Sequence, residues 1–441
     1  MKPDPRAILN DSAMSRAQIL AIAITVALNA LDGFDVLAIS FASPGIAAEW
    51  GIDRAALGLV LAMELIGMAV GSVFLGGLAD RVGRRPMILF CLCVMALGMF
   101  MVPLTSSIFT LMLWRVFTGL GIGGMLAATN AVAAEYSNTR NRNLSVSLMA
   151  IGYPVGAVLG GAVVAQLLKT GDWRSVFWFG GAVTLAFLPI VWFLLPETIP
   201  FLCHKRGEGA LAKVNASLAR MGHAPVAALP PVEDAERRRS VLDLFRPGLV
   251  ATTLLVTLAY FAHIATFYFI LKWVPKIVVD MGFAPSAAAG VLVWANVGGA
   301  TGGALFGLLA RRFALRGLTV GALIASVAMV SWFGSGQSDL AQLSLIAAIA
   351  GFFTNAGVVG LYATFAQAFP THVRATGTGF AIGIGRGGAA LSPILAGYLF
   401  QNGLGLQGVA IVMAAGAGVA AVALLLLPRG AGEASKPERP A

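Results

Sequence analysis

The stretch GGLADRVGRR, residues 76–85, places four charges within six residues of an otherwise apolar part of the chain. It separates two apolar runs, centred near residues 65 and 97, that are each long enough to cross a membrane. Gly76 lets two helices approach, Asp80 is available to basic partners, and Gly83 permits a tight turn. The pattern predicts a short charged loop between two membrane-spanning helices.

The rest of the chain has the same apolar character. It is 58% hydrophobic and 11% charged, with a mean hydropathy of +0.84, whereas soluble domains are about 25% charged. A span needs about 20 mostly apolar residues, and we count twelve such runs. Their centres lie near residues 30, 65, 97, 122, 156, 185, 260, 298, 326, 355, 388 and 416. The sequence predicts an all-α polytopic membrane protein.

The positive charge, a net +10, predicts orientation and not nucleic-acid binding. Of the 30 Lys and Arg residues, 23 lie in the termini, the central loop and the loops on their side, five lie in the opposite loops, and Arg115 and Arg386 lie within spans. This asymmetry predicts that both termini face the cytoplasm. The opposite five are Arg54, Lys169, Arg174, Lys272 and Lys276. The three cysteines indicate neither a disulfide scaffold nor a metal site.

Domain organisation follows from one long polar segment and an internal repeat. Residues 196–247 form a predicted cytosolic linker between two six-helix halves, 1–195 and 248–428, and residues 429–441 form a cytosolic tail. GGLADRVGRR has a degraded copy, FGLLARRFALR, 231 residues later, and AEYSNTRNR resembles AQAFPTHVR. Two related six-helix halves are typical of secondary transporters.

The motifs resemble those of a known family. GGLADRVGRR is similar to the loop between the second and third spans of the major facilitator superfamily, and Arg115 with Gly119 matches its pattern in the fourth span. The resemblance implies the major facilitator fold, with twelve transmembrane helices in two pseudo-symmetric halves. Two departures are Arg311, which stands where the loop copy would carry Asp, and Glu64, an unexpected acid in the second span.

Within that superfamily the chain resembles the aromatic acid:proton symporters. The motifs that carry this resemblance are LDGFD, EYSNTRNR, LPETIPFL and GIGRGGAALSP. It implies import of benzoate-like or hydroxybenzoate-like anions with protons, in a bacterial inner membrane. The energy source would be the proton gradient, with no cofactor and no enzymatic activity, and we expect a monomer in the lipid bilayer.

A predicted cytosolic gate combines the loop with the end of the fourth span. Glu135 is expected to pair with Arg81, Arg84 or Arg142 near the inner surface. The predicted gating residues are Gly76, Asp80, Arg81, Gly83, Arg84, Arg85, Glu135 and Arg142.

The first span, ALNALDGFDVLAIS, carries two acids on one helix face, Asp32 and Asp35, in line with Asn29. Each charge at a bilayer centre costs roughly 2.5–3.5 kcal/mol. The acids could form a structural ion pair with Arg115 or Arg386. Alternatively they bind protons, because burial and a like-charged neighbour both favour protonation. We favour Asp32 as the proton carrier and Asp35 as its coupled partner.

Three further intramembrane groups join the proton-coupling candidates. The position of Arg115 in the fourth span is equally consistent with a role in proton coupling and with direct contact to the substrate. Glu64 is either a second protonatable group or half of a structural pair. His263 could relay protons, since histidine titrates near neutral pH, or could pack helices together.

The predicted substrate site centres on Arg386 in GIGRGGAA, where missing side chains would leave room for a ligand and the planar guanidinium suits a carboxylate. A structural partnership with an acid such as Asp32 is the alternative. Aromatic side chains could stack on an aryl ring, although most intramembrane aromatics only pack. The other candidates for substrate binding are Asn296, Asn355, Tyr153 and Trp294.

The sequence therefore favours a proton-coupled importer of small aromatic carboxylates that works by alternating access. A proton-coupled exporter on the same fold, an importer of non-aromatic organic acids, and a non-transporting sensor or channel are the alternatives. The fifth span lacks the Gly-Pro dipeptide common in export relatives, which weakens the exporter. No phosphate-binding Walker loop is present, so ATP-driven transport is unsupported.

Overall fold

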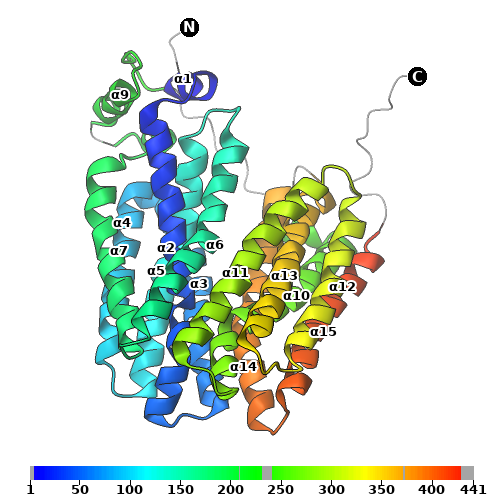
Figure 1. Ribbon diagram of the computed structural model, residues 1–441. Coiled ribbons are helices and arrows are strands. Elements are labelled where there is room, and N and C mark those ends of the chain that lie inside the picture. The colour runs from blue at the N-terminus through cyan, green and yellow to red at the C-terminus, as the bar shows by residue number, and fades with distance from the viewer. Residues whose placement is uncertain (1–3, 208, 231–240, 371–372, 429–441) are drawn as a thin grey trace. The chain divides into compact units, whose positions relative to one another are not determined.

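The computed structural model describes residues 4–207, 209–230, 241–370 and 373–428 (Figure 1). These residues form helices and no β-strand. Twelve of the helices are long and apolar enough to cross a membrane, and their positions confirm the twelve predicted spans. The tail, residues 429–441, and part of the predicted linker lie outside the described residues.

The spans follow one another in chain order, with four short helical elements around them. The first six are α2 (Arg16–Trp50), α3 (Arg54–Val82), α4 (Arg84–Met101, continued by η1, Val102–Leu104), α5 (Ile108–Glu135), α6 (Arg142–Leu167) and α7 (Arg174–Leu194). The second six are α10 (Val250–Asp280), α11 (Pro285–Leu309), α12 (Leu315–Phe333), α13 (Leu340–Ala368), α14 (Arg374–Gln401) and α15 (Leu406–Leu426). The short elements are α1 (Pro5–Asp11), α8 (Ile199–Lys205), α9 (Ala210–Arg220) and η2 (Val241–Phe245).

The chain forms two compact units. The first contains Met1–Ile39, Met63–Val163 and Gly171–Ala235, and the second contains Ser40–Ala62, Val164–Thr170 and Glu236–Ala441. The end of α2 and the beginning of α3 thus group with the second unit. The predicted boundaries at 196–247 stay a prediction.

Small residues bring helices of the first unit into backbone contact. A Cβ atom on Gly156 of α6 would lie 1.7 Å from the carbonyl oxygen of Ala30 on α2, and one on Gly119 of α5 would lie 2.2 Å from that of Glu64 on α3. No side chain fits at such distances, so only glycine allows these approaches. They hold α2 against α6, and α3 against α5.

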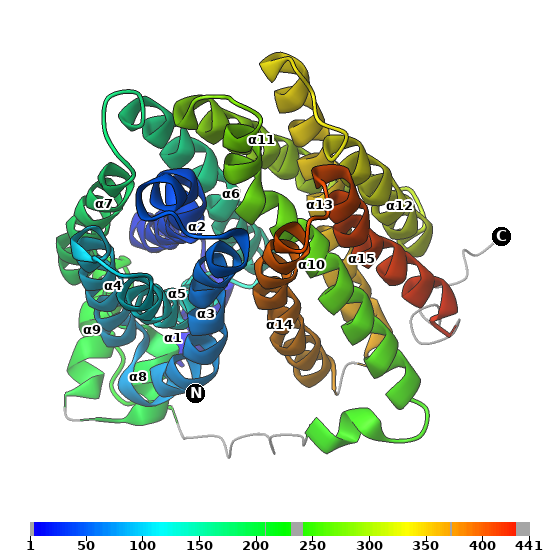
Figure 2. The same cartoon turned by 90° about the horizontal axis from the view of Figure 1, so that it is seen from below.

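The second unit repeats this arrangement between its own equivalent spans. A Cβ atom on Gly298 of α11 would lie 1.8 Å from the Ala348 carbonyl oxygen of α13, and one on Gly351 of α13 would lie 2.0 Å from that of Ala295. The contact between the second and fourth spans therefore recurs between the eighth and tenth. Helices α10, α14 and α15 pack together beside this pair (Figure 2).

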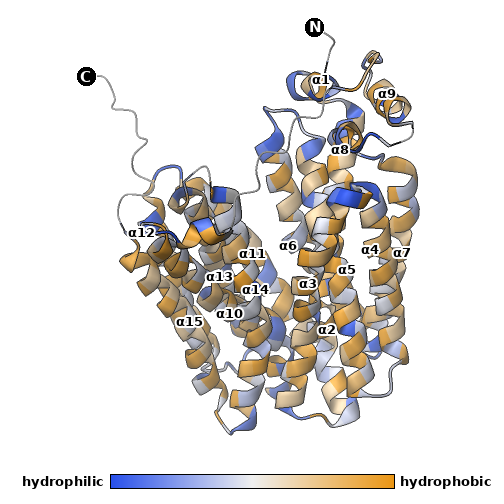
Figure 3. Ribbon diagram, turned by 180° about the vertical axis from the view of Figure 1, so that it is seen from behind, coloured by the Kyte–Doolittle hydropathy of each residue, from blue (hydrophilic) through white to orange (hydrophobic). Residues whose placement is uncertain are grey.

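Hydrophobic residues run along most of each span, and hydrophilic residues gather near the helix ends (Figure 3). Two predicted loop positions are wrong. Lys272 lies inside α10 with 0% exposure. The reason is length: α10 has 31 residues, well beyond the roughly 20 that hydropathy marks as a span. Lys276 also lies in α10, where it pairs with Asp280.

Candidate functional site

Four charged side chains gather in the interior of the first unit. Asp32 is 2% exposed, and Asp35, Glu64 and Arg115 are 0% exposed. They come from α2, α3 and α5, and the glycine contact described above holds α3 against α5. Since buried charges are costly without partners, the pairing within this cluster decides what each group can do.

Arg115 is committed to Glu64. The two form an ion pair, and the Arg115 guanidinium also donates from Nη2 to the main-chain oxygen of Asp35 at 3.3 Å. The Phe177 ring lies 5.4 Å from its central carbon. The structure therefore shows one of the two predicted roles of Glu64, that of half of an ion pair. Its role in proton transfer stays a prediction.

Asp32 has no such partner among the described residues. Neither of its carboxylate oxygens accepts a hydrogen bond there. Asp35 lies next to Thr184 and Gly180 of α7. A buried carboxylate without a cation is far cheaper as the neutral acid than as the anion, so Asp32 suits reversible protonation. Asn29 has a structural role, because its amide donates to the Met149 carbonyl oxygen at 2.7 Å.

The predicted gating residues meet around Arg84. Its guanidinium lies 2.9 Å from Asp80 and 2.9 Å from Glu135. Arg84 is thus the partner of Glu135 among the three arginines considered, while Arg142 donates to Asn10 at 2.8 Å. The loop therefore connects the ends of α3, α4 and α5 through one arginine.

Glu197, which sequence reasoning did not select, completes this network. Its carboxylate accepts hydrogen bonds from the main-chain N–H groups of Arg84 at 3.1 Å, Arg85 at 3.2 Å and Thr198 at 2.9 Å. Burial raises the pKa of Glu197, and these hydrogen bonds oppose that effect. Gly83 has φ 120°, and a Cβ atom on it would lie 2.4 Å from Glu197 Oε2. An acid suits the N-terminus of α4, but no local signal links residues so distant in sequence.

In the second unit, Arg386 of α14 lies near a pair of tyrosines. The hydroxyl groups of Tyr260 on α10 and Tyr362 on α13 are 3.0 Å apart, and the charge of Arg386 acts on the Tyr260 hydroxyl. Tyr260 is buried, whereas Tyr362 is 44% exposed. Both tyrosines were missed because single tyrosines within spans give no distinctive pattern.

The glycines around Arg386 do not leave the expected room. A Cβ atom on Gly385 would lie 2.0 Å from the Tyr260 ring, and one on Gly388 would lie 2.3 Å from the Phe261 carbonyl oxygen. Side chains and backbone of α10 occupy that space, and only Gly383 faces open space. The glycines therefore pack α14 against α10, which places Arg386 beside Tyr260.

Two of the three polar candidates of the second unit join neighbouring helices, and the third bonds within its own helix. His263 is 0% exposed, and its Nε2 lies 2.8 Å from the Thr354 carbonyl oxygen. Asn355 donates to the Gly299 carbonyl oxygen at 2.6 Å and so joins α13 to α11. Asn296 donates to Leu292 within its own helix at 2.9 Å.

The two remaining aromatic candidates lie in different units. Trp294 of α11 is 54% exposed. In the first unit, a Cβ atom on Gly33 would lie 2.0 Å from the Tyr153 carbonyl oxygen, so the Tyr153 backbone packs against α2. The contribution of these residues to substrate binding stays a prediction.

Twelve spans with a repeated interhelical contact, a buried acid cluster and an arginine beside paired tyrosines define a secondary membrane transporter. The chain belongs to the Major Facilitator Superfamily, whose sequence pattern matches residues 25–339 and 256–441. It is 31% identical over 400 residues to a gallate transporter of Pseudomonas putida, covering 89% of this chain and 88% of that protein.

Two further comparisons agree. The chain is 31% identical over 417 residues to a 3-(3-hydroxy-phenyl)propionate transporter of Escherichia coli (strain K12), covering 94% of this chain and 95% of that protein. The inward-open structure of the E. coli xylose transporter superposes with a TM-score of 0.71 at 17% identity, covering 93% of this chain and 96% of that one. The latter likeness shows the fold.

Proposed function

We propose that the protein is a proton-coupled symporter that imports small aromatic carboxylates of the benzoate or hydroxybenzoate type by alternating access. One observation carries the proposal. In the first unit the buried Arg115 pairs with Glu64 and not with Asp32, so that Asp32 has no cationic partner among the described residues. The relatives named for aromatic acids support the substrate class.

Asp32 would carry the proton. It loads a proton when accessible from outside and releases it when accessible from the cytoplasm, because the buried anion is unfavourable without a partner. Asp35, one helical turn away on α2, would tune this step as a like-charged neighbour. The Glu64–Arg115 pair would hold the backbone of Asp35 in place through the hydrogen bond from Arg115.

Arg386 would bind the substrate carboxylate, with the Tyr260–Tyr362 pair near it. In the Tyr260–Tyr362 hydrogen bond one hydroxyl donates and the other accepts. When Tyr260 donates, the hydroxyl proton of Tyr362 is available to a ligand carboxylate or phenol. The partly exposed Tyr362 ring would provide an apolar surface for an aryl group, and the buried Phe365 ring packs behind it at 6.1 Å between ring centroids.

Proton coupling supplies the driving force for import. Moving one negative charge inward against 100 mV costs about 2.3 kcal/mol, one accompanying proton cancels that cost, and a second would make the potential favourable. We place the protein in the bacterial inner membrane with both termini in the cytoplasm, on the basis of its charge asymmetry. Arg246 lies in the predicted cytosolic linker. If a membrane-impermeant thiol reagent labelled the Arg246→Cys variant in intact cells, that result would contradict this orientation.

The test is uptake of labelled benzoate into proteoliposomes with an imposed pH gradient, acidic outside. We expect accumulation that a protonophore abolishes, and competition by hydroxybenzoates that exceeds competition by pyridine and aliphatic acids. Stronger competition by aliphatic acids would identify a non-aromatic importer. Benzoate efflux from preloaded proteoliposomes under the same gradient, acidic outside, would indicate an exporter that exchanges substrate for protons, and binding without accumulation would indicate a sensor.

A further inference from the structure

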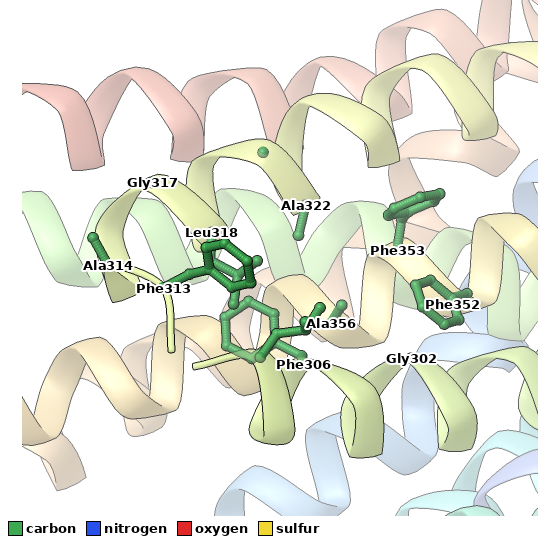
Figure 4. A pocket seen from close by; sticks show the side chains of 12 residues that line it. Gly302, Phe306, Phe313, Ala314, Gly317, Leu318, Ala322, Phe352, Phe353 and Ala356 are labelled. Atoms are coloured by element: carbon green, nitrogen blue, oxygen red, sulfur yellow. The ribbon is translucent and has the colours of Figure 1, made fainter. Parts of the chain in front are cut away.

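An apolar cavity of about 410 Å³ lies between α11, α12 and α13 of the second unit (Figure 4). Phe306, Ala322 and Ala356 form its buried floor, and Phe313 forms a wall that is 60% exposed. This volume is within the roughly 300–1,000 Å³ range of small-molecule pockets. We call it the α12 groove.

Two glycines on α12 keep the groove open. A Cβ atom on Gly317 or Gly321 would meet no atom within 4 Å, and both glycines line the cavity. They differ in this from the glycines that bring helices into contact, such as Gly298 and Gly351. Their missing side chains therefore leave a space that the protein itself does not fill.

One end of the groove carries two positive charges. Arg311 and Arg312 directly precede the lining residues Phe313 and Ala314, and both arginines are exposed. Within the part of the chain that the structure describes, neither forms an ion pair. Arg316, the second residue of α12, donates to the Leu425 carbonyl oxygen.

The acidic residues of the second six spans lie elsewhere. Residues 241–428 contain three acids: Asp243, Asp280 and Asp339. Asp243 pairs with Arg246 at 2.7 Å, and Asp280 pairs with Arg54 at 3.2 Å. Asp339 caps the beginning of α13, beyond the opposite end of α12. Among the described residues of this range, no acid pairs with the two arginines.

We propose that the α12 groove binds an anionic phospholipid, with an acyl chain against Phe306 and Phe313 and the phosphate at Arg311 and Arg312. An acyl chain matches the apolar lining, and an anionic headgroup matches the arginines at the mouth. Basic pockets between transmembrane helices are suited to anionic headgroups. This explains why Arg311 stands where the first-half loop has Asp80: the loop copy recognises lipid instead of pairing internally.

The experiment uses the full-length protein in phosphatidylcholine nanodiscs that contain a small fraction of a lipid with a diazirine in its acyl chain. One sample contains labelled phosphatidylglycerol and the other labelled phosphatidylcholine. After photolysis, mass spectrometry locates the cross-links. We expect phosphatidylglycerol to label Phe306–Ala322 and Phe352–Ala356 about 25-fold more than phosphatidylcholine, since each of the two arginines near the surface contributes about fivefold.

Two variants distinguish recognition of the lipid headgroup from binding of its acyl chain. Arg311→Gln/Arg312→Gln should remove the preference for phosphatidylglycerol, whereas Lys213→Gln/Arg220→Gln on α9, with the same loss of charge, should retain it. Gly321→Leu should fill the groove and reduce labelling by both lipids. Gly307→Leu is its control, because Gly307 also faces open space but does not line the cavity.

Equal labelling by the two lipids, or full labelling of Gly321→Leu, would overturn the proposal. So would a dimer in native mass spectrometry whose formation excludes the labelled lipid, since a second copy would then occupy the groove. Because the readout is lipid labelling and not uptake, its outcome does not depend on the proposed substrate.

Discussion

The guanidinium of Arg115 forms an ion pair with the carboxylate of Glu64, and neither side chain has any exposure. The two residues are brought together by the glycine contacts between α3 and α5. In a buried pair, loss of one partner leaves an uncompensated charge that costs about 3–5 kcal/mol, whereas replacing both with apolar residues is often neutral.

We therefore predict that Glu64→Gln strongly lowers the thermal unfolding temperature, by an amount that reflects about 3–5 kcal/mol. The double variant Glu64→Leu/Arg115→Met should recover most of that loss, because no buried charge remains. Thermal unfolding in detergent, followed by tryptophan fluorescence, measures both. A Glu64→Gln protein that melts with the wild type would show that the pair adds nothing to stability.

Asp32→Asn imitates a permanently protonated carrier. We expect it to abolish concentrative uptake while substrate binding and exchange of internal for external substrate persist. Asp35→Asn should be milder and move the pH optimum toward acid, since Asp32 loses a like-charged neighbour. Uptake into proteoliposomes over a series of imposed pH gradients distinguishes these outcomes. Accumulation by Asp32→Asn in proportion to the gradient would make Asp32 a structural group.

Arg386→Gln should weaken apparent substrate affinity by tenfold or more, because a hydrogen bond to a charged group contributes roughly 1.5–3 kcal/mol. Arg386→Lys should also bind weakly, since it keeps the charge but loses the planar fork. Both variants should insert normally. Concentration-dependent uptake gives the affinity, and wild-type affinity in Arg386→Gln would exclude Arg386 as the carboxylate anchor.

Asp80→Asn should lower turnover and leave equilibrium substrate affinity nearly unchanged. Asp80 helps Arg84 hold the ends of α3 and α5 together, and this network lies at the end of those helices. Asp172→Asn, which removes another exposed acid that pairs with an arginine, is the matched control and should transport normally. A large loss of affinity in Asp80→Asn at unchanged turnover would contradict the gating role.

Gly156→Ala should destabilise the protein and impair uptake, because the new methyl group would lie 1.7 Å from the Ala30 carbonyl oxygen and force α6 away from α2. Gly77→Ala adds the same group where no atom lies within 4 Å, so it should keep wild-type stability. The unfolding temperatures of the two variants test this directly. Equal unfolding temperatures for the two variants would mean that α6 and α2 move apart without a loss of stability.

The sequence alone determined the membrane class, the twelve spans, the internal repeat and the charged segment of residues 76–85, although in the structure only Gly83 of this segment lies outside a helix. These features depend on apolar length and charge along the chain, which local composition reveals. The same signal misplaced Lys272, because hydropathy marks a membrane crossing and not the full length of a helix such as α10.

Only the tertiary structure decided which groups meet. Glu64 rather than Asp32 holds Arg115, Glu197 caps α4 behind Gly83, and the Tyr260 ring fills the space beside Gly385. The partners in each contact are far apart in sequence, and the approach of two helix backbones sets their distance. The sequence shows that a buried carboxyl group needs either a cationic partner or a proton. Which of the two it has depends on the helix packing that the glycines allow.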